Sequence, residues 1–484
     1  MLDGIGTVSA SGVPDFWGGM NSKNSGNGGG EGFPPPSPLP TDPNFDPNAN
    51  LDWMDASCWA ARKSGKNACD AKSYFDTLQC MEATFESAWK GTSGAEQGAR
   101  MFGSKAITPE CLKSMKDTLH NWYPMLHRIF VYFSCVGSES TNRIHGMPYL
   151  AFSQFLDDAR LVLEPGQKDK AVARYARPRG EDGFDLLWVT VNSSASSSSS
   201  EFDTKSVLSR SEFLEVLVRA AIGGKTVDGM PRCVNEICED LLTFLSRHSH
   251  AATIMHNPDG FRRSYCYRQE VCAVLDHHRK TLESLFTVYC DGGTGLGGLE
   301  QSSMMSAQEF CNLLEEVGFL KELTYRRVFV IFAQSRMVAI NEDSKRSQMG
   351  QLNQLTYEGF LEAVVRCALV KCLPTDKEMK KSEFFYPGQF LGSLLDQGVA
   401  VYNAWRDKAM RMQRAGVGDP IWRRLDTFIL LIVSVMQYGV EKQPGGAKLL
   451  IRGSPDEILA LKEVQCYHKK PTPYLFEAPG EAST

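Results

Sequence analysis

Apolar residues recur every three or four positions over most of the chain from Leu51 onward, which is the spacing of amphipathic α-helices. The pattern is clearest at 233–248, CVNEICEDLLTFLSRH, where it predicts one long helix. Residues 1–50 lack this periodicity and contain ten glycines and eight prolines, a composition that cannot bury a core. The chain is therefore predicted to be mainly α, with extended, irregular N- and C-terminal segments.

Two segments of the chain repeat one another without a gap. LSRSEFLEVLVRAA at 208–221 and LTYEGFLEAVVRCA at 355–368 share seven of fourteen positions. Upstream, LHRIFVYFS at 126–134 resembles LESLFTVYC at 282–290, and each is followed by a polar loop and a short amphipathic helix. An order of elements that occurs twice indicates two copies of one arrangement. We therefore expect two lobes, each made of a pair of helix–loop–helix units.

Two of the expected helices begin with a capping motif. Ser209 precedes Glu212 by three residues, and Ser306 precedes Glu309 in the same way, each ahead of an apolar run. In such a capping box the serine hydroxyl accepts a hydrogen bond from the glutamate backbone, and the glutamate carboxylate accepts one from the serine backbone. These motifs therefore predict one helix start in each lobe.

These patterns divide the chain of 484 residues into five regions. They are an extended Gly/Pro-rich arm at 1–50, a helical N-terminal segment at 51–114, a first lobe at 115–230, a linker helix with a second lobe at 231–370, and a C-terminal helical region with an extended tail at 371–484. The length suffices for several cores of ordinary domain size.

Paired helix–loop–helix units with an aromatic residue before the loop and Phe-Leu after it resemble the EF-hand family in its two-lobed, calmodulin-like arrangement. The resemblance covers about residues 115–370 and rests on SRSEFLEVLVRAA, FRRSYCYRQEVCAVLDHH, MSAQEFCNLLEEVGF and LTYEGFLEAVVRCA. The order of these motifs is also similar to that of long, degenerate EF-hand-like proteins of flagellated and ciliated single-celled eukaryotes. The resemblance implies a non-enzymatic component of a cilium or flagellum, associated with axonemal microtubules.

The loops depart from the calcium-binding pattern of that family. A working loop places oxygen ligands at positions 1, 3 and 5, glycine at 6 and glutamate at 12. The best candidate, DGGTGLGGLEQS, begins at Asp291 and has Ser302 at the twelfth place. Asp291 is the only carboxylate at a ligand position, so it is a weak calcium candidate. We expect the helices of the family without its ion, and no cofactor.

The net charge and the hydropathy of the chain exclude some classes of binding partner. The chain holds 52 basic and 57 acidic side chains, a net charge of −5, which gives no overall basic field for nucleic acid or anionic lipid. The longest apolar stretch, 428–436, would rise about 14 Å as a helix, under half of a bilayer core of about 30 Å. We expect no nucleic-acid partner and no membrane span, and the resemblance described above implies a location in the cytoplasm and its cytoskeleton.

Catalytic motifs are missing or incomplete in the sequence. GxSxG and HExxH do not occur, and Gly223-Gly224-Lys225-Thr226 lacks the earlier glycine of a phosphate-binding loop. The fourteen cysteines contain no CxxC, although Cys58, Cys69 and Cys80 are spaced by eleven, which would place them on one stripe of a continuous helix. We predict that the protein is not an enzyme. The alternatives are a calcium-responsive regulatory adaptor and a thiol- or metal-dependent enzyme.

Aromatic and basic residues in the two terminal regions are the candidates for partner contact. A basic helix with tryptophans either binds a partner, such as the acidic surface of tubulin, or turns its aromatics into the core. The candidate residues are Phe16, Trp17, Phe33, Trp405, Arg411, Arg414 and Trp422. The expected function is that of a structural scaffold that binds protein partners in a large cytoskeletal assembly.

Overall fold

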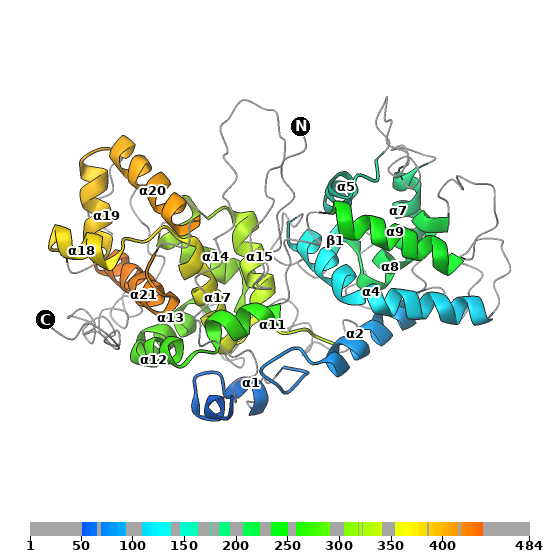
Figure 1. The fold of residues 1–484 in the computed structure, drawn as a ribbon, viewed down its shortest axis with the longest axis horizontal. Coiled ribbons are helices and arrows are strands. Elements are labelled where there is room, and N and C mark those ends of the chain that lie inside the picture. The colour runs from blue at the N-terminus through cyan, green and yellow to red at the C-terminus, as the bar shows by residue number, and fades with distance from the viewer. Residues whose placement is uncertain are drawn as a thin grey trace, which may run out of the picture.

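The structure is a computed structural model. It describes residues 51–64, 69–92, 109–136, 146–162, 176, 183–193, 207–222, 234–249, 258–290, 304–317, 319–321, 323–340, 354–384, 387–414 and 418–438. These residues are mainly helical, which confirms the predicted class, and their apolar side chains form two separate buried groups that we name the first core and the second core. The two cores lie side by side in Figure 1.

The first core is enclosed by helices from the first half of the chain. Its elements are α2 (Leu78–Gly91), α4 (Pro109–Val136), α5 (Tyr149–Asp158), α7 (Phe184–Ser193), α8 (Arg210–Ile222) and α9 (Val234–His248). Two-residue strands precede α5 and α8 and pair with each other. Strand β1 (Met147–Pro148) is antiparallel to β2 (Val207–Leu208), with Met147 opposite Leu208. The pairing joins the segment before α5 to the segment before α8.

The second core repeats this order of elements. Its helices include α12 (Gln269–His277), α13 (Arg279–Cys290), α14 (Ala307–Glu316), α15 (Tyr325–Ser335) and α17 (Tyr357–Val370). Strand β3 (Met305–Ser306) is antiparallel to β4 (Gln354–Leu355), with Met305 opposite Leu355. The short elements α11 (Pro258–Phe261), η3 (Arg262–Cys266) and η4 (Phe319–Lys321) complete it.

Both predicted capping boxes form. The Ser209 amide donates to the Glu212 carboxylate at 2.7 Å and the Glu212 amide donates to the Ser209 hydroxyl at 3.3 Å. The same two bonds join Ser306 and Glu309, at 2.6 and 3.3 Å. A third box, Thr375 with Glu378, starts α18 (Asp376–Ser382). Each box satisfies backbone N–H groups that a helix start leaves unpaired.

The C-terminal helices complete the second core. After α18 come α19 (Pro387–Asp396), α20 (Val399–Arg414) and α21 (Ile421–Tyr438). In α21 the side chains from Leu425 to Val433 are buried, and Phe428 packs on Phe319 with ring centroids 5.1 Å apart. The apolar stretch is therefore a buried helix, as its length predicts. None of the helices in the described part of the chain is both long and apolar enough to cross a bilayer.

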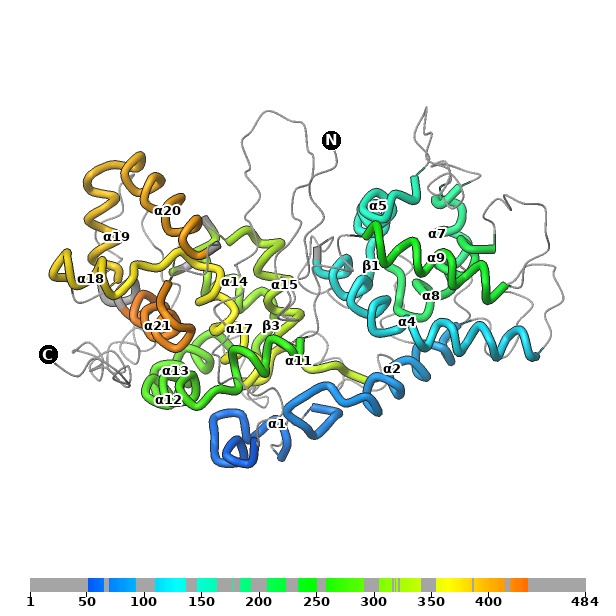
Figure 2. The backbone as a smooth tube through the Cα atoms, in the orientation of Figure 1, coloured from blue at the N-terminus to red at the C-terminus, as the bar shows by residue number. Residues whose placement is uncertain are grey.

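The N-terminal segment contributes to both cores. It begins with η1 (Asp52–Ala56) and α1 (Ala61–Ser64), and here Met54 and Trp59 are buried in the second core. It then leads to α2, where Phe85 and Trp89 are buried in the first core. Figure 2 shows this blue segment passing below the second core and on toward α4. The region predicted at 51–114 thus links the two cores through packed side chains.

The eleven-residue cysteine spacing does not produce a helical stripe. Cys58 precedes α1, Cys69 lies in a turn that follows it, and only Cys80 lies on α2. The three thiols therefore lie in different elements. They do not share one helix, so the condition for a common helical stripe is not met.

Helix α4 of the first core packs directly on α15 of the second. Val330 of α15 is buried in the first core, whereas Cys135 of α4 is buried in the second. Arg326 donates a hydrogen bond to the Tyr132 hydroxyl at 3.3 Å. A second bridge is made by Arg210, whose guanidinium donates to carbonyl oxygens of the segment that follows α15. The two cores therefore share an interface of apolar and polar contacts.

Candidate functional site

The densest group of buried charges surrounds the Glu362 carboxylate on α17. Its Oε1 accepts hydrogen bonds from Nε and Nη2 of Arg366 at 3.0 and 2.5 Å. Its Oε2 accepts from Nη2 of Arg62 at 2.8 Å and from Nε of Arg262 at 3.0 Å. All four side chains are at most 3 % exposed. We name these four residues the Glu362 cluster.

Each arginine of the cluster comes from a different part of the chain. Arg366 follows Glu362 by one turn of α17, the spacing that brings side chains together on a helix. Arg62 lies on α1, 300 residues from its partner, and Arg262 lies at the start of η3, 100 residues from it. The cluster therefore fastens the N-terminal segment and the middle of the chain to the repeated helix.

Further polar groups balance the positive charge of the cluster. Arg262 Nη1 also binds the carboxylates of Asp76 at 2.9 Å and Asp259 at 2.8 Å. Arg62 Nη1 donates to the Tyr267 hydroxyl at 2.6 Å. Three guanidinium groups thus meet three carboxylates. Buried charges are tolerated when they are paired and hydrogen-bonded in this way.

The electrostatics of the cluster keep its carboxylate ionised. Burial alone would raise the pKa of Glu362, but the charges of Arg262, Arg366 and Arg62 outweigh it and hold this pKa at about 2. Burial also opposes the charged form of Arg262, yet the neighbouring carboxylates, Glu362 first among them, raise its pKa well above the ordinary value. The ion pairs therefore persist across the physiological pH range.

The first core holds a reduced version of this arrangement at the equivalent repeat positions. Arg219 donates to the Glu215 carboxylate from Nε at 2.9 Å and from Nη2 at 2.5 Å, one helical turn away. The Arg219 side chain is 18 % exposed, whereas Arg366 is fully buried. The sequence repeat contains both of these pairs. It contains no signal for the two distant arginines that complete the second site.

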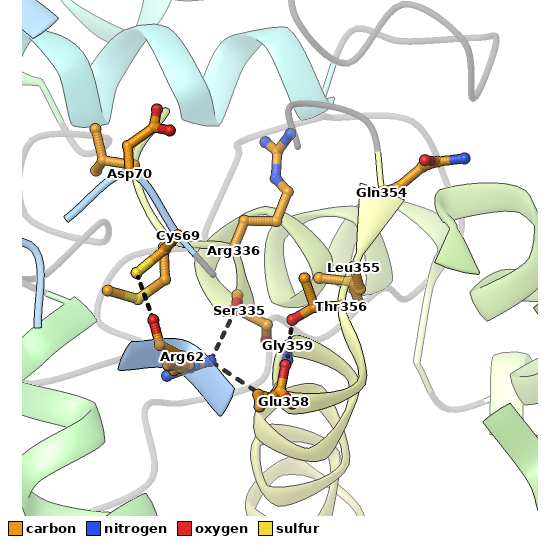
Figure 3. Close-up of a pocket in the computed structure, with 12 residues that line it drawn as sticks. Arg62, Cys69, Asp70, Ser335, Arg336, Gln354, Leu355, Thr356, Glu358 and Gly359 are labelled. Carbon is orange, nitrogen blue, oxygen red and sulfur yellow. Dashed lines mark hydrogen bonds between the residues drawn. The ribbon is translucent and has the colours of Figure 1, made fainter. Parts of the chain in front are cut away.

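A small cavity lies beside the cluster. Figure 3 shows Arg62 close to Ser335 and Glu358, and its Nη2 donates to both of their carbonyl oxygens at 3.4 Å. Cys69 and Arg336 also line this space. The cavity volume of about 40 Å³ suits a few water molecules, whereas small-molecule sites measure roughly 300–1,000 Å³. The arrangement is that of a structural junction.

A second buried polar group fixes α21 to the rest of the second core. His278 Nε2 and Asp426 Oδ1 lie 2.7 Å apart, and both side chains are at most 2 % exposed. The other Asp426 oxygen accepts from Arg423 Nη1 at 2.8 Å. Arg424 Nη2 donates at 3.1 Å to the carbonyl oxygens of Ala368 and Lys371, where α17 ends. These contacts satisfy helix-end carbonyls and hold α21 in its apolar site.

The buried thiols lack the environment of a reactive cysteine. Burial raises the pKa of four of them to about 12, and these are Cys80, Cys135, Cys238 and Cys311. A thiol with a raised pKa holds little nucleophilic thiolate at neutral pH. In the ranges described above, no three His, Cys, Asp or Glu side chains are grouped as a metal site would require.

The predicted partner residues fall into two sets. Trp405 and Trp422 are half-buried and pack against the second core, and Trp405 Nε1 donates to Glu378 Oε1 at 3.1 Å. Arg411 is exposed on α20, and Arg414 is the last residue of that helix. The structure therefore separates the tryptophans from the exposed base. The other candidates, Phe16, Trp17, Phe33 and Asp291, lie outside the described residues.

Comparisons with protein-family models, curated proteins and solved structures found no match to this chain.

Proposed function

We propose that this chain is a non-enzymatic structural protein of a cytoskeletal assembly, built from two EF-hand-like lobes. Its paired helix–loop–helix units support this proposal, because each core repeats the order helix, loop, short strand and helix. The antiparallel pairs β1–β2 and β3–β4 join the units within each core in the same register relative to the repeated leucines, Leu208 and Leu355. The repeat in sequence therefore corresponds to a repeat in structure.

The observation that carries the proposal is that both cores are closed by helices of the same chain. Helix α9 packs on α4 and α8 in the first core, and α21 packs on α12 and α17 in the second. Calcium sensors of the EF-hand type act by opening and exposing an apolar groove. Here such an opening would have to break the contacts of Asp426 and Arg424 as well as the apolar packing of α21. The geometry favours a rigid module over a sensor.

The proposed location is the axoneme of a cilium or flagellum. This step rests on the sequence resemblance to degenerate EF-hand-like proteins of flagellated organisms. We expect the protein to remain with the axoneme when flagella are extracted with non-ionic detergent, and immunoblots of the two fractions would measure it. Release of most of the protein with the membrane and matrix fraction would contradict the proposal.

Calcium is expected to leave the stability of the protein unchanged. A site with a Kd of 10 μM would add about 2.7 kcal/mol at 1 mM calcium, since the ligand is then 100 times its Kd. We expect the thermal unfolding midpoints measured in 1 mM Ca²⁺ and in EGTA to coincide, with 1 mM Mg²⁺ as the ionic control. A calcium-specific rise in the midpoint would favour the regulatory adaptor over the structural protein.

A further inference from the structure

The C-terminal helices carry a positive charge that the chain as a whole does not have. Residues 371–438 contain ten basic and seven acidic side chains, whereas the net charge of the chain is −5. Five of the basic residues are exposed, namely Lys377, Lys380, Lys381, Lys408 and Arg411. Among the acidic residues described here, Glu383 and Asp396 are exposed, and the Asp407 side chain is 48 % exposed and pairs with Arg406 at 3.4 Å. In this region the exposed basic side chains therefore outnumber the exposed acidic side chains.

The acidic side chains of this region are engaged in holding the fold. Asp376 accepts two hydrogen bonds from Arg423 Nε, at 2.7 and 2.8 Å. Glu378 completes the capping box of α18 and accepts from Trp405. Asp426 is 2 % exposed and lies against His278. These three carboxylates are thus engaged in contacts within the fold.

The exposed bases lie on two helices that meet. The hydrogen bond between Trp405 and Glu378 joins the middle of α20 to the first turn of α18. On α18, Lys377 and Lys381 are one helical turn apart. On α20, Lys408 and Arg411 are three residues apart and share a stripe that continues into the exposed Val401. No ion pair involves any of these four bases within the described residues. We name them the basic face.

We propose that the basic face docks an acidic, glutamate-rich segment of a protein partner. The inference rests on the proposed function, which requires protein partners such as tubulin. Charge complementarity selects the occupant, because four exposed cations on two joined helices attract clustered carboxylates and steer their approach. The exposed end of the stripe, Val401, is 39 % exposed and would contact an apolar residue next to the acidic run.

The test is a direct binding measurement with the full chain. A fluorescein-labelled peptide of ten glutamates followed by leucine is titrated with the protein, and a glutamine peptide of equal length is the probe control. The variant replaces Lys377, Lys381, Lys408 and Arg411 by glutamate. A control with half of this charge change carries Lys90→Glu and Lys113→Glu, two exposed lysines associated with the first core. Because exposed ion pairs are weak singly but act together here, the fourfold variant should bind about tenfold less tightly or worse.

Two further measurements make the result decisive. The pairs Lys377→Glu/Lys381→Glu and Lys408→Glu/Arg411→Glu are tested separately, and each should give an intermediate loss with an unchanged thermal midpoint. Raising the salt concentration from 50 to 300 mM should weaken wild-type binding, because salt screens exposed charges. Equal binding by the wild type and the fourfold variant would overturn the inference. Equally tight binding to phosphatidylserine vesicles or duplex DNA would overturn the assignment to an acidic peptide.

The outcome is distinguishable from a failure of the proposed function. A wild-type protein that binds the glutamate peptide and yet leaves detergent-extracted flagella would keep the basic face and refute the axonemal location. A fourfold variant that loses the peptide but stays with the axoneme would refute this face as the axonemal contact while the structural role stands.

Discussion

Replacement of Glu362 by glutamine is expected to destabilise the second core by about 3–5 kcal/mol, because three fully or nearly fully buried guanidinium groups lose their common carboxylate. The loss would be measured as a lower denaturation midpoint in urea, followed by tryptophan fluorescence. Trp59 lies in the second core next to the cluster, with its ring 5.2 Å from the Arg62 guanidinium carbon. Its emission is therefore expected to respond to this transition.

The matched control for this change is Glu215→Gln in the first core. It removes the same side chain from the same repeat position, but it breaks the bonds of a partly exposed arginine of the same helix, Arg219. We expect a loss of about 1–2 kcal/mol, since the guanidinium can reach water. Equal losses for the two variants would contradict the central role given to the Glu362 cluster.

The cluster also predicts how stability depends on pH. The pKa of Glu362 is about 2 in the folded protein against an ordinary 4.5, so the ionised form is favoured by folding. A depressed carboxyl pKa stabilises the fold fully above about pH 4.5, and this contribution, about 3 kcal/mol, is lost as the pH falls toward 2. The difference between the unfolding midpoints of wild type and Glu362→Gln should therefore narrow as the pH falls from 7 to 3.

The second large effect is expected from Phe428→Ala in α21. The Phe428 side chain is 1 % exposed and packs on Phe319, so its removal leaves a cavity in the second core. Phenylalanine-to-alanine changes at such sites cost about 3–5 kcal/mol. We expect a matching fall in the urea midpoint and greater cleavage within α21 under limited proteolysis, because the helix would be less firmly held.

Phe384→Ala is the matched control for the change in α21. Phe384 is partly buried at the edge of the same core, so its truncation should cost less than half as much. A small effect of Phe428→Ala together with unchanged proteolysis would mean that α21 does not close the core, and would remove the main support for a rigid module.

The features that the sequence predicts are those that depend on nearby residues. Helical periodicity and the two capping boxes both involve residues three or four positions apart, and both are present in the structure. Arg62 and Arg262 reach Glu362 across 300 and 100 residues, and their own neighbourhoods carry no mark of that contact. Only the packing of separate segments brings them together.

The face of α20 could have been predicted better from spacing alone. Trp405 and Arg411 are six residues apart. This spacing rotates one side chain about 240° around the helix axis relative to the other and places them on different sides of the helix. Lys408 and Arg411 are three apart and share a side. The list of candidate aromatic and basic residues followed composition, whereas the helical angle decides which of these side chains a partner can reach.

The span between Arg62 and Glu362 has a consequence for how the protein is made. At about 5–20 residues per second, ribosomes would finish α17 roughly 15–60 s after Arg62 has been added to the chain. The helices of the first core are synthesised within that interval, so this core can form while α1 still lacks its docking site. The last event of folding is then the return of an early segment to late ones, a long-range closure that is slow by its topology. Newly made chains would wait in a half-assembled state, with Trp59 exposed to chaperones.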